Sequence, residues 1–171
     1  VAIAFSNEPA TDAEETIPAG DNDYVENNTF AYTVTITYSN DGAQLTGATS
    51  AVTATVDGAH VTVRSVGRSV HYIVRGESNN GSLKIYNTNK FQLTLDGVTL
   101  HNPNGAAINN QCGKSLYLVL AEGSNNTLSC GASAQTIVGE DLKGAVFSEG
   151  QIILSGSGTL TVESNYRNGI A

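Results

Sequence analysis

Hydrophobic and polar residues alternate along most of the chain in very short runs. Residues 31–38, AYTVTITY, alternate apolar side chains with threonine, which is the pattern of a half-buried β-strand. Turn signals at 40–42 and 57–58 separate further segments that are rich in Val and Thr. The pattern predicts a small β meander over residues 29–69, and almost nothing in the chain reads as helix.

From Val70 onward, short apolar segments recur in three types, separated by polar or Gly-containing turns. The segments of the first type are FQLTL, LYLVL and QIILS, at 91–95, 116–120 and 151–155. Those of the second type are VTLHN, NTLSC and TLTVE, at 98–102, 126–130 and 159–163. Those of the third type are SLKIYN, GAAINN, GAVFSE and NGIA, at 82–87, 105–110, 144–149 and 168–171.

This cycle predicts a parallel β-helix with three short strands per rung. One rung cannot bury its apolar face alone, so stacked rungs build a core of Leu, Ile and Val. Gly and Asn suit the corners because they tolerate positive φ. An antiparallel sandwich is the alternative, but its strands are usually longer and it does not predict a threefold grouping. We therefore expect an all-β protein with a meander cap at 29–69 and β-helix rungs at 70–171.

The charge is unevenly distributed along the 171 residues, whose formal net charge is −8. Residues 1–63 contain nine Asp and Glu but no Lys or Arg, whereas residues 64–171 contain seven acids and all eight bases. An acidic chain argues against nucleic acid as a partner. The apolar runs are too short for a membrane span.

Residues 1–28 hold seven of the acids together with Pro and Gly, and they lack periodicity. They are predicted to form a flexible acidic arm, either a linker or a tether to a lipid anchor further upstream. Calcium binding by Asp21, Asp23 and Glu26 is the alternative. Cys112 and Cys130 either form one disulfide in an exported protein or remain two buried thiols.

Five ordered blocks of sequence carry a resemblance to a known family. They are ITYSNDGAQLTG (36–47), VTATVDGAHVTVRSVGRSVHYIVRG (52–76), LTLDGVTLHNPNGAAI (93–108), LAEGSNNTLSCG (120–131) and GAVFSEGQIILSGSGTLTVESNYRNGI (144–170). From about Thr29 to the end, the chain resembles the bacterial carbohydrate-binding domain family first described from a cellulolytic Clostridium.

The resemblance implies a right-handed β-helix related in shape to pectate lyases. It also implies an exported protein, at the bacterial cell surface or extracellular, that binds calcium and plant cell-wall polysaccharide such as cellulose or polygalacturonate. Members of the family are not established enzymes. They usually continue for several more rungs, so we expect the native chain to continue past Ala171.

The candidate metal ligands are Glu140, Asp141 and Glu149, in the insertion at 131–149. Calcium takes six to eight oxygen ligands, and the family resemblance places an acidic loop at this point. The alternative is a solvated loop in which Glu140 and Asp141 pair with Lys143.

The candidate sugar-binding residues are Tyr86, Tyr117, Asn102 and Asn104. Sugar sites use flat aromatic faces and planar polar groups, and both tyrosines alternate with inward Leu and Ile, so we expect them to point outward. The asparagines can bind sugar hydroxyls, or they can satisfy backbone groups at the corners.

Together with the family resemblance, these residues favour non-catalytic binding of polysaccharide that is assisted or stabilised by calcium. A calcium-dependent lyase of the pectate type is one alternative, weakened because no Arg that could act as a base lies between 76 and 166. A surface adhesin or structural stalk without affinity for sugar is the other alternative.

Overall fold

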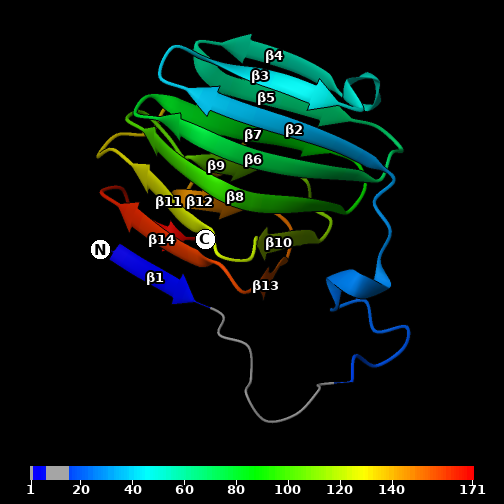
Figure 1. Ribbon diagram of the computed structural model, residues 1–171. Coiled ribbons are helices and arrows are strands. Elements are labelled where there is room, and N and C mark those ends of the chain that lie inside the picture. The colour runs from blue at the N-terminus through cyan, green and yellow to red at the C-terminus, as the bar shows by residue number, and fades with distance from the viewer. Residues whose placement is uncertain (1, 7–15) are drawn as a thin grey trace.

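The computed structural model describes residues 2–6 and 16–171, and these residues form an all-β protein with two sheets (Figure 1). The nine-stranded sheet within this part of the chain contains β1 (Ala2–Ser6), β2 (Tyr32–Ser39), β3 (Gly42–Gly47), β6 (Val70–Ser78), β8 (Phe91–Asn102), β10 (Leu116–Leu120), β11 (Asn125–Cys130), β13 (Ile152–Gly156) and β14 (Thr159–Ser164). We call it sheet A.

The second sheet, sheet B, has six strands among the described residues. They are β4 (Thr53–Asp57), β5 (Ala59–Ser65), β7 (Gly81–Asn87), β9 (Ile108–Asn110), β12 (Gly144–Ser148) and β15 (Asn168–Ile170). Two short 3-10 turns, η1 (Val25–Asn27) and η2 (Thr49–Ala51), complete the regular structure of these ranges.

The chain passes from one sheet to the other along its length, and strands of the same predicted type pair in parallel. The aligned residues are Leu93, Leu118 and Leu154 for the first type, Leu100, Leu128 and Val162 for the second, and Ile108, Val146 and Ile170 for the third. Strand β8 contains both a first-type and a second-type segment. The three segment types that the sequence predicts are therefore confirmed as in-register neighbours.

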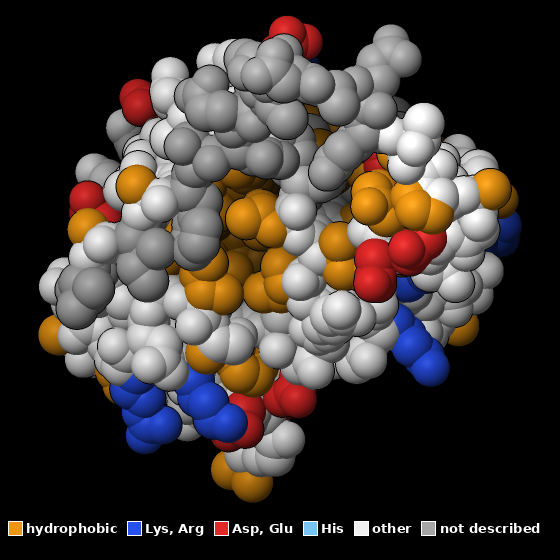
Figure 2. All heavy atoms as spheres, turned by 90° about the horizontal axis from the view of Figure 1, so that it is seen from below, with side chains coloured by type: hydrophobic (Ala, Val, Ile, Leu, Met, Phe, Trp, Pro, Cys, Tyr) orange, Lys and Arg blue, Asp and Glu red, His pale blue; other side chains and the backbone are white. Residues whose placement is uncertain are grey.

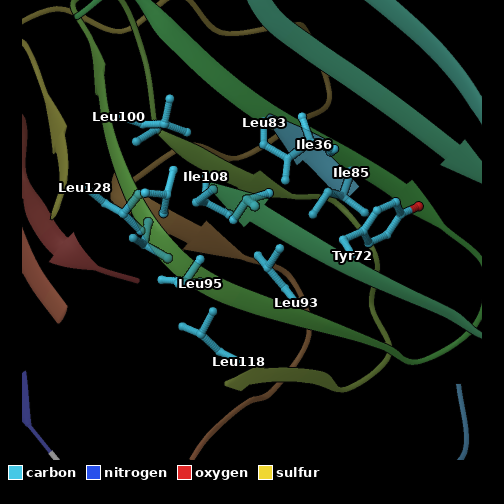
Figure 3. Close-up of a cluster of buried hydrophobic side chains, with 14 of the residues drawn as sticks. Ile36, Tyr72, Leu83, Ile85, Leu93, Leu95, Leu100, Ile108, Leu118 and Leu128 are labelled. Carbon is cyan, nitrogen blue, oxygen red and sulfur yellow. The ribbon is translucent and has the colours of Figure 1, made fainter. Parts of the chain in front are cut away.

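The core lies between the two sheets, which face each other (Figures 1 and 3). Leu93, Leu95 and Tyr72 of sheet A point toward Leu83 and Ile85 of sheet B, and all five are fully buried. Removing these side chains from water is the main force that holds the sheets together.

The sheets are mixed, because antiparallel strands lie at their ends. Strand β3 pairs antiparallel with β2, β4 with β5, and β1 with β14. No strand of one sheet pairs with a strand of the other in the described ranges, so the two sheets are not closed by strand pairing. The all-β class is confirmed, and the division at residues 28 and 69 stays a prediction.

The N-terminal region is partly described. Residues 2–6 form strand β1 beside β14, and residues 16–28 include η1. The predicted acidic arm also contains Glu8, Asp12, Glu14 and Glu15, which lie outside the described residues.

The lower end of the structure has a hollow in which hydrophobic side chains gather (Figure 2). Strands β13 and β15 are the last strands that pair with β10 and β12. Ile152 and Ile170 pack against the core but are only partly buried, and Leu154 is 39 % exposed.

Truncation of Leu95 to alanine should destabilise the fold, because the side chain is fully buried between the sheets. We expect L95A to lower the free energy of unfolding by about 2–5 kcal/mol, measured by urea denaturation. The control is V66A, since Val66 is 77 % exposed and its truncation should change stability by less than about 0.5 kcal/mol. Equal losses in the two variants would contradict the assignment of the core.

Candidate functional site

A cleft of about 410 Å³ lies against the outer side of sheet B. Its walls come from β5, β7, the corner after β8, β9 and the segment 131–143. The lining residues are His60, Ser82, Leu83, Lys84, Asn102, Asn104, Gly105, Ala106, Asn109, Gln135, Thr136, Ile137 and Leu142.

Alternation along the strands of sheet B places polar side chains on this outer face. On β7, Leu83 and Ile85 are buried in the core, whereas Ser82 and Lys84 are only half-buried. Successive side chains of a strand point to opposite faces, so the same pattern that builds the core exposes these polar groups. Parallel pairing of β7 with β9 then places Lys84 beside Asn109.

The segment 131–143 packs over the outer face of sheet B through an apolar cluster of its own. Leu142 packs with Ala106 and Phe147 in a small buried cluster that is separate from the main core. The backbone N–H of Gln135 donates to the carbonyl oxygen of Asn104 at 2.8 Å. These contacts make the segment the outer wall of the cleft.

A group of charged and aromatic side chains joins this segment to β7. The Nζ of Lys84 donates to Oε2 of Glu140 at 2.5 Å, and the hydroxyl of Tyr86 donates to Oε1 of the same carboxylate. The guanidinium carbon of Arg64 lies 4.0 Å from the centre of the Tyr86 ring. The side chains of Lys84 and Glu140 are 19 % and 21 % exposed, so water screens this pair only in part.

The pKa values of the pair move apart. Burial by itself lowers the pKa of Lys84, but hydrogen bonds with Glu140 and Tyr86 outweigh it and raise that pKa. Burial opposes the ionised form of Glu140 in the same way, and the hydrogen bonds from Lys84 and Tyr86 outweigh it and lower the pKa of Glu140. Both groups are therefore ionised at neutral pH.

His60, on β5, also lines the cleft. Its Nδ1 lies 2.8 Å from the hydroxyl oxygen of Ser82, and its Nε2 lies 2.9 Å from Oδ1 of Asn80. Both ring nitrogens thus have partners from the β7 side of the sheet, and the ring is held in one orientation.

Two of the four predicted sugar-binding residues line the cleft. Asn102 also supports the corner, since its amide nitrogen donates to the carbonyl of Ala106 at 2.9 Å and its Oδ1 accepts from the N–H of Asn104 at 3.1 Å. Asn104 is exposed, and its Oδ1 lies 3.4 Å from the Ser133 hydroxyl oxygen. This geometry agrees with both expectations for the asparagines: they can bind sugar hydroxyls in the cleft, and Asn102 satisfies backbone groups at the corner.

The two tyrosines are not available as flat platforms. Tyr86 points outward as predicted, but Arg64 covers its ring and Glu140 accepts its hydroxyl hydrogen. The prediction of an outward platform at Tyr117 is wrong, because the residue is 1 % exposed. Its hydroxyl donates to the carbonyl of Asn22 at 2.5 Å, and its ring centre lies 5.6 Å from that of Phe30. These N-terminal residues are distant in the sequence, Asn22 by 95 positions, so local alternation could not reveal them.

The predicted metal ligands do not fit calcium in this conformation. Glu140 is held by Lys84 and Tyr86, and Asp141 pairs with Lys143 at 2.8 Å. No group of three or more His, Cys, Asp or Glu side chains that could hold a metal occurs in residues 2–6 and 16–171. Neither the predicted set with Glu149 nor the alternative set at 21–26 therefore converges. Calcium binding stays a prediction from the family resemblance.

Several polar residues of the cleft, among them Lys84, His60 and Gln135, are not among the site residues that the sequence predicts. For Lys84 the sequence does carry a signal, because alternation on β7 places it on the outer face. The contribution of Gln135 depends on the path of the 131–143 segment, for which the local sequence carries no periodic signal. The structure also shows that Cys112 and Cys130 are free and buried.

Comparison with known proteins agrees with the predicted family. The profile of the family described as "carbohydrate-binding domain-containing protein" matches residues 57–171. The chain belongs to this carbohydrate-binding domain family. A curated protein of the same description from Acetivibrio thermocellus is 31 % identical over 121 residues, which are 67 % of this chain and 42 % of that protein. The chain therefore spans less than half the length of this relative.

A solved structure shares the fold of this member of the carbohydrate-binding domain family. It is the gadolinium derivative of a protein from C. thermocellum that is described as polysaccharide lyase-like, and it matches with a TM-score of 0.67 at 24 % identity. The match covers 81 % of this chain and 55 % of the other. At this level of identity the likeness establishes the fold alone. None of the helices in the described part of this chain has the length and apolar character needed to cross a membrane.

The contribution of Glu140 to stability should depend on pH. Its pKa in the folded protein lies below the ordinary value of 4.5, so the contribution is fully present above that value and is lost as the pH falls through the lower, folded pKa. The difference in unfolding free energy between the unmodified protein and E140Q should therefore shrink over this acidic range, measured by urea denaturation at a series of pH values.

The matched control for this experiment is D141N. Asp141 is the next residue and pairs with Lys143 on the surface, where the two side chains are 60 % and 46 % exposed. Exposed pairs contribute little to stability, so D141N should differ little from the unmodified protein at any pH. A pH profile for D141N equal to that of E140Q would show that the Lys84–Glu140 contact is not its cause.

Proposed function

We propose that the protein binds polysaccharide without catalysing its cleavage, in the cleft between the outer face of sheet B and the segment 131–143. The observation that carries the proposal is the lining of this cleft. Amide and hydroxyl side chains from four separate regions converge there, in a chain of the carbohydrate-binding domain family.

The lining suits a sugar chain on chemical grounds. The amides of Asn104, Asn109 and Gln135 can donate and accept hydrogen bonds, as sugar hydroxyls do. Ala106 and Ile137 add apolar surface on which the C–H faces of a sugar ring can pack. The volume of about 410 Å³ is within the usual range for ligand sites.

The state of the cationic side chain in the cleft supports binding without chemistry. A lyase needs a base that takes up the proton next to a uronate carboxylate. Burial lowers the pKa of Lys84, but the contacts with Glu140 and Tyr86 outweigh this effect and raise the pKa. The amine of Lys84 therefore stays protonated. The solved neighbour is described as polysaccharide lyase-like, but at 24 % identity it supports only the shared fold.

The proposal extends to architecture and location. We place the two stacked sheets in a right-handed parallel β-helix, and the parallel register of the three strand types supports this. We place the protein outside the bacterial cell, with a plant cell-wall polysaccharide such as cellulose or polygalacturonate as its partner; the resemblance to an exported family supports this placement. The proposed binding mode gives calcium no role in the cleft, and calcium binding by the protein stays a prediction from the family resemblance.

Retention on insoluble polysaccharide tests this function. We expect the protein to be retained on insoluble cellulose, and N104A to bind about twofold to tenfold more weakly, because one neutral hydrogen bond contributes about 0.5–1.5 kcal/mol. The control is N79A, since Asn79 is also exposed but lines a separate hollow with Asn40 and His101. Depletion assays with and without a chelator measure both variants.

The outcome also separates the alternatives. An adhesin or stalk without affinity for sugar predicts no retention of any variant, with or without calcium. New absorbance from an unsaturated product on polygalacturonate would contradict the non-catalytic assignment. Equal weakening by N104A and N79A would contradict the location of the site.

A further inference from the structure

The cleft contains a charged group whose charge is already balanced. Among the described residues that line the cleft, Lys84 is the one Lys, Arg, Asp or Glu side chain. Its ammonium group lies 2.5 Å from the carboxylate of Glu140, and both side chains are largely buried. The ammonium group of Lys84 is therefore already paired and is not free to bind the carboxylate of a ligand.

The rest of the lining offers no unpaired group that could replace this cation. It consists of amides, hydroxyls and apolar surface, with Asn104, Asn109 and Thr136 as examples, and of His60, whose two ring nitrogens already contact Ser82 and Asn80. Arg64 lies over the ring of Tyr86 and is not one of the lining residues. Such a surface can bind neutral hydroxyl groups, but it cannot neutralise a second carboxylate.

We propose that Glu140, which is not itself a lining residue but pairs with Lys84 of the lining, determines the specificity of this cleft, so that the cleft selects neutral polysaccharide chains and rejects polyuronates. The inference rests on the proposed function, namely that the cleft binds a sugar chain. A uronate in the cleft brings a second negative charge close to Glu140. Its carboxylate must also give up hydration water, and no unpaired cation is present to compensate this cost. Rejection of this kind, by an uncompensated charge, is a general device of specific binding sites.

Removal of the Glu140 charge should reverse the selection. In E140Q, the amine of Lys84 loses its acidic partner, and Arg64 lies close by on Tyr86. The cleft then offers a cation to a carboxylated sugar. A neutral chain gains nothing from this change, because it carries no charge to pair with Lys84.

The experiment compares cellohexaose with a galacturonate hexamer, by titration calorimetry in buffer with chelator so that calcium cannot bridge two acids. We expect the unmodified protein to bind the neutral hexamer more tightly. E140Q should bind the galacturonate about tenfold more tightly than the unmodified protein does, which is about 1.4 kcal/mol. The gain should shrink in high salt, since it is electrostatic.

Two variants separate selectivity from a merely structural role. D141N removes the same charge from the neighbouring residue, which contacts Lys143 and not Lys84, so it should leave the ratio of the two affinities unchanged. The double variant K84Q/E140Q should lose the gain for galacturonate but still bind cellohexaose. If Glu140 had a purely structural role, E140Q would lower the affinity for both hexamers together.

The failure of this inference differs from failure of the proposed function. Tighter binding of galacturonate than of cellohexaose by the unmodified protein overturns the inference, even if E140Q does not fold. An unchanged affinity ratio in a folded E140Q, checked by circular dichroism, also overturns it, and polysaccharide binding itself then still stands. Absence of binding to both hexamers and to insoluble polysaccharide overturns the proposed function.

Discussion

In-register stacking of inward aliphatic side chains is the interaction on which the rest of the structure depends. The strands are short, with β9 and β15 only three residues long, and strands of this length are not stable alone. Each is held because its inward residue packs on the same type of residue in the next strand, as Leu118 does between Leu93 and Leu154. Burial of these side chains provides the free energy, and parallel hydrogen bonds set the register.

The outer surface is a consequence of this inner constraint. Since every second residue must point inward, the residues between them have to face outward in equally regular rows. His60 and Ser82 stand side by side on neighbouring strands for this reason, as do Lys84 and Asn109. The segment 131–143 is the irregular part of this arrangement. Its own apolar anchor, with Leu142, holds it against the sheet and turns a flat face into a cleft.

Part of the candidate site could be predicted from local sequence. The corner asparagines follow from the end of a strand, since Asn102 is the last residue of β8 and Asn104 lies just after it, and the outward direction of Tyr86 follows from alternation on β7. The same rule gives the direction of Tyr117 correctly, but the prediction of an exposed platform there is wrong. Its side chain does leave the core side of β10, but the residues near Asn22 return from far away in the sequence and cover it.

The all-β class, the three repeating strand types and the inward residues of each can be read from the amino-acid sequence alone. These features follow from two sequence patterns. Apolar and polar residues alternate over a few positions, and the same segment types recur in successive turns of the cycle. Which polar groups meet outside the sheets, in contrast, depends on the tertiary fold. Glu140 reaches Lys84 across 56 positions, and no periodic pattern links the two. Their contact depends on the path of an irregular segment, so only the tertiary fold decides that this acid is the partner of a lysine.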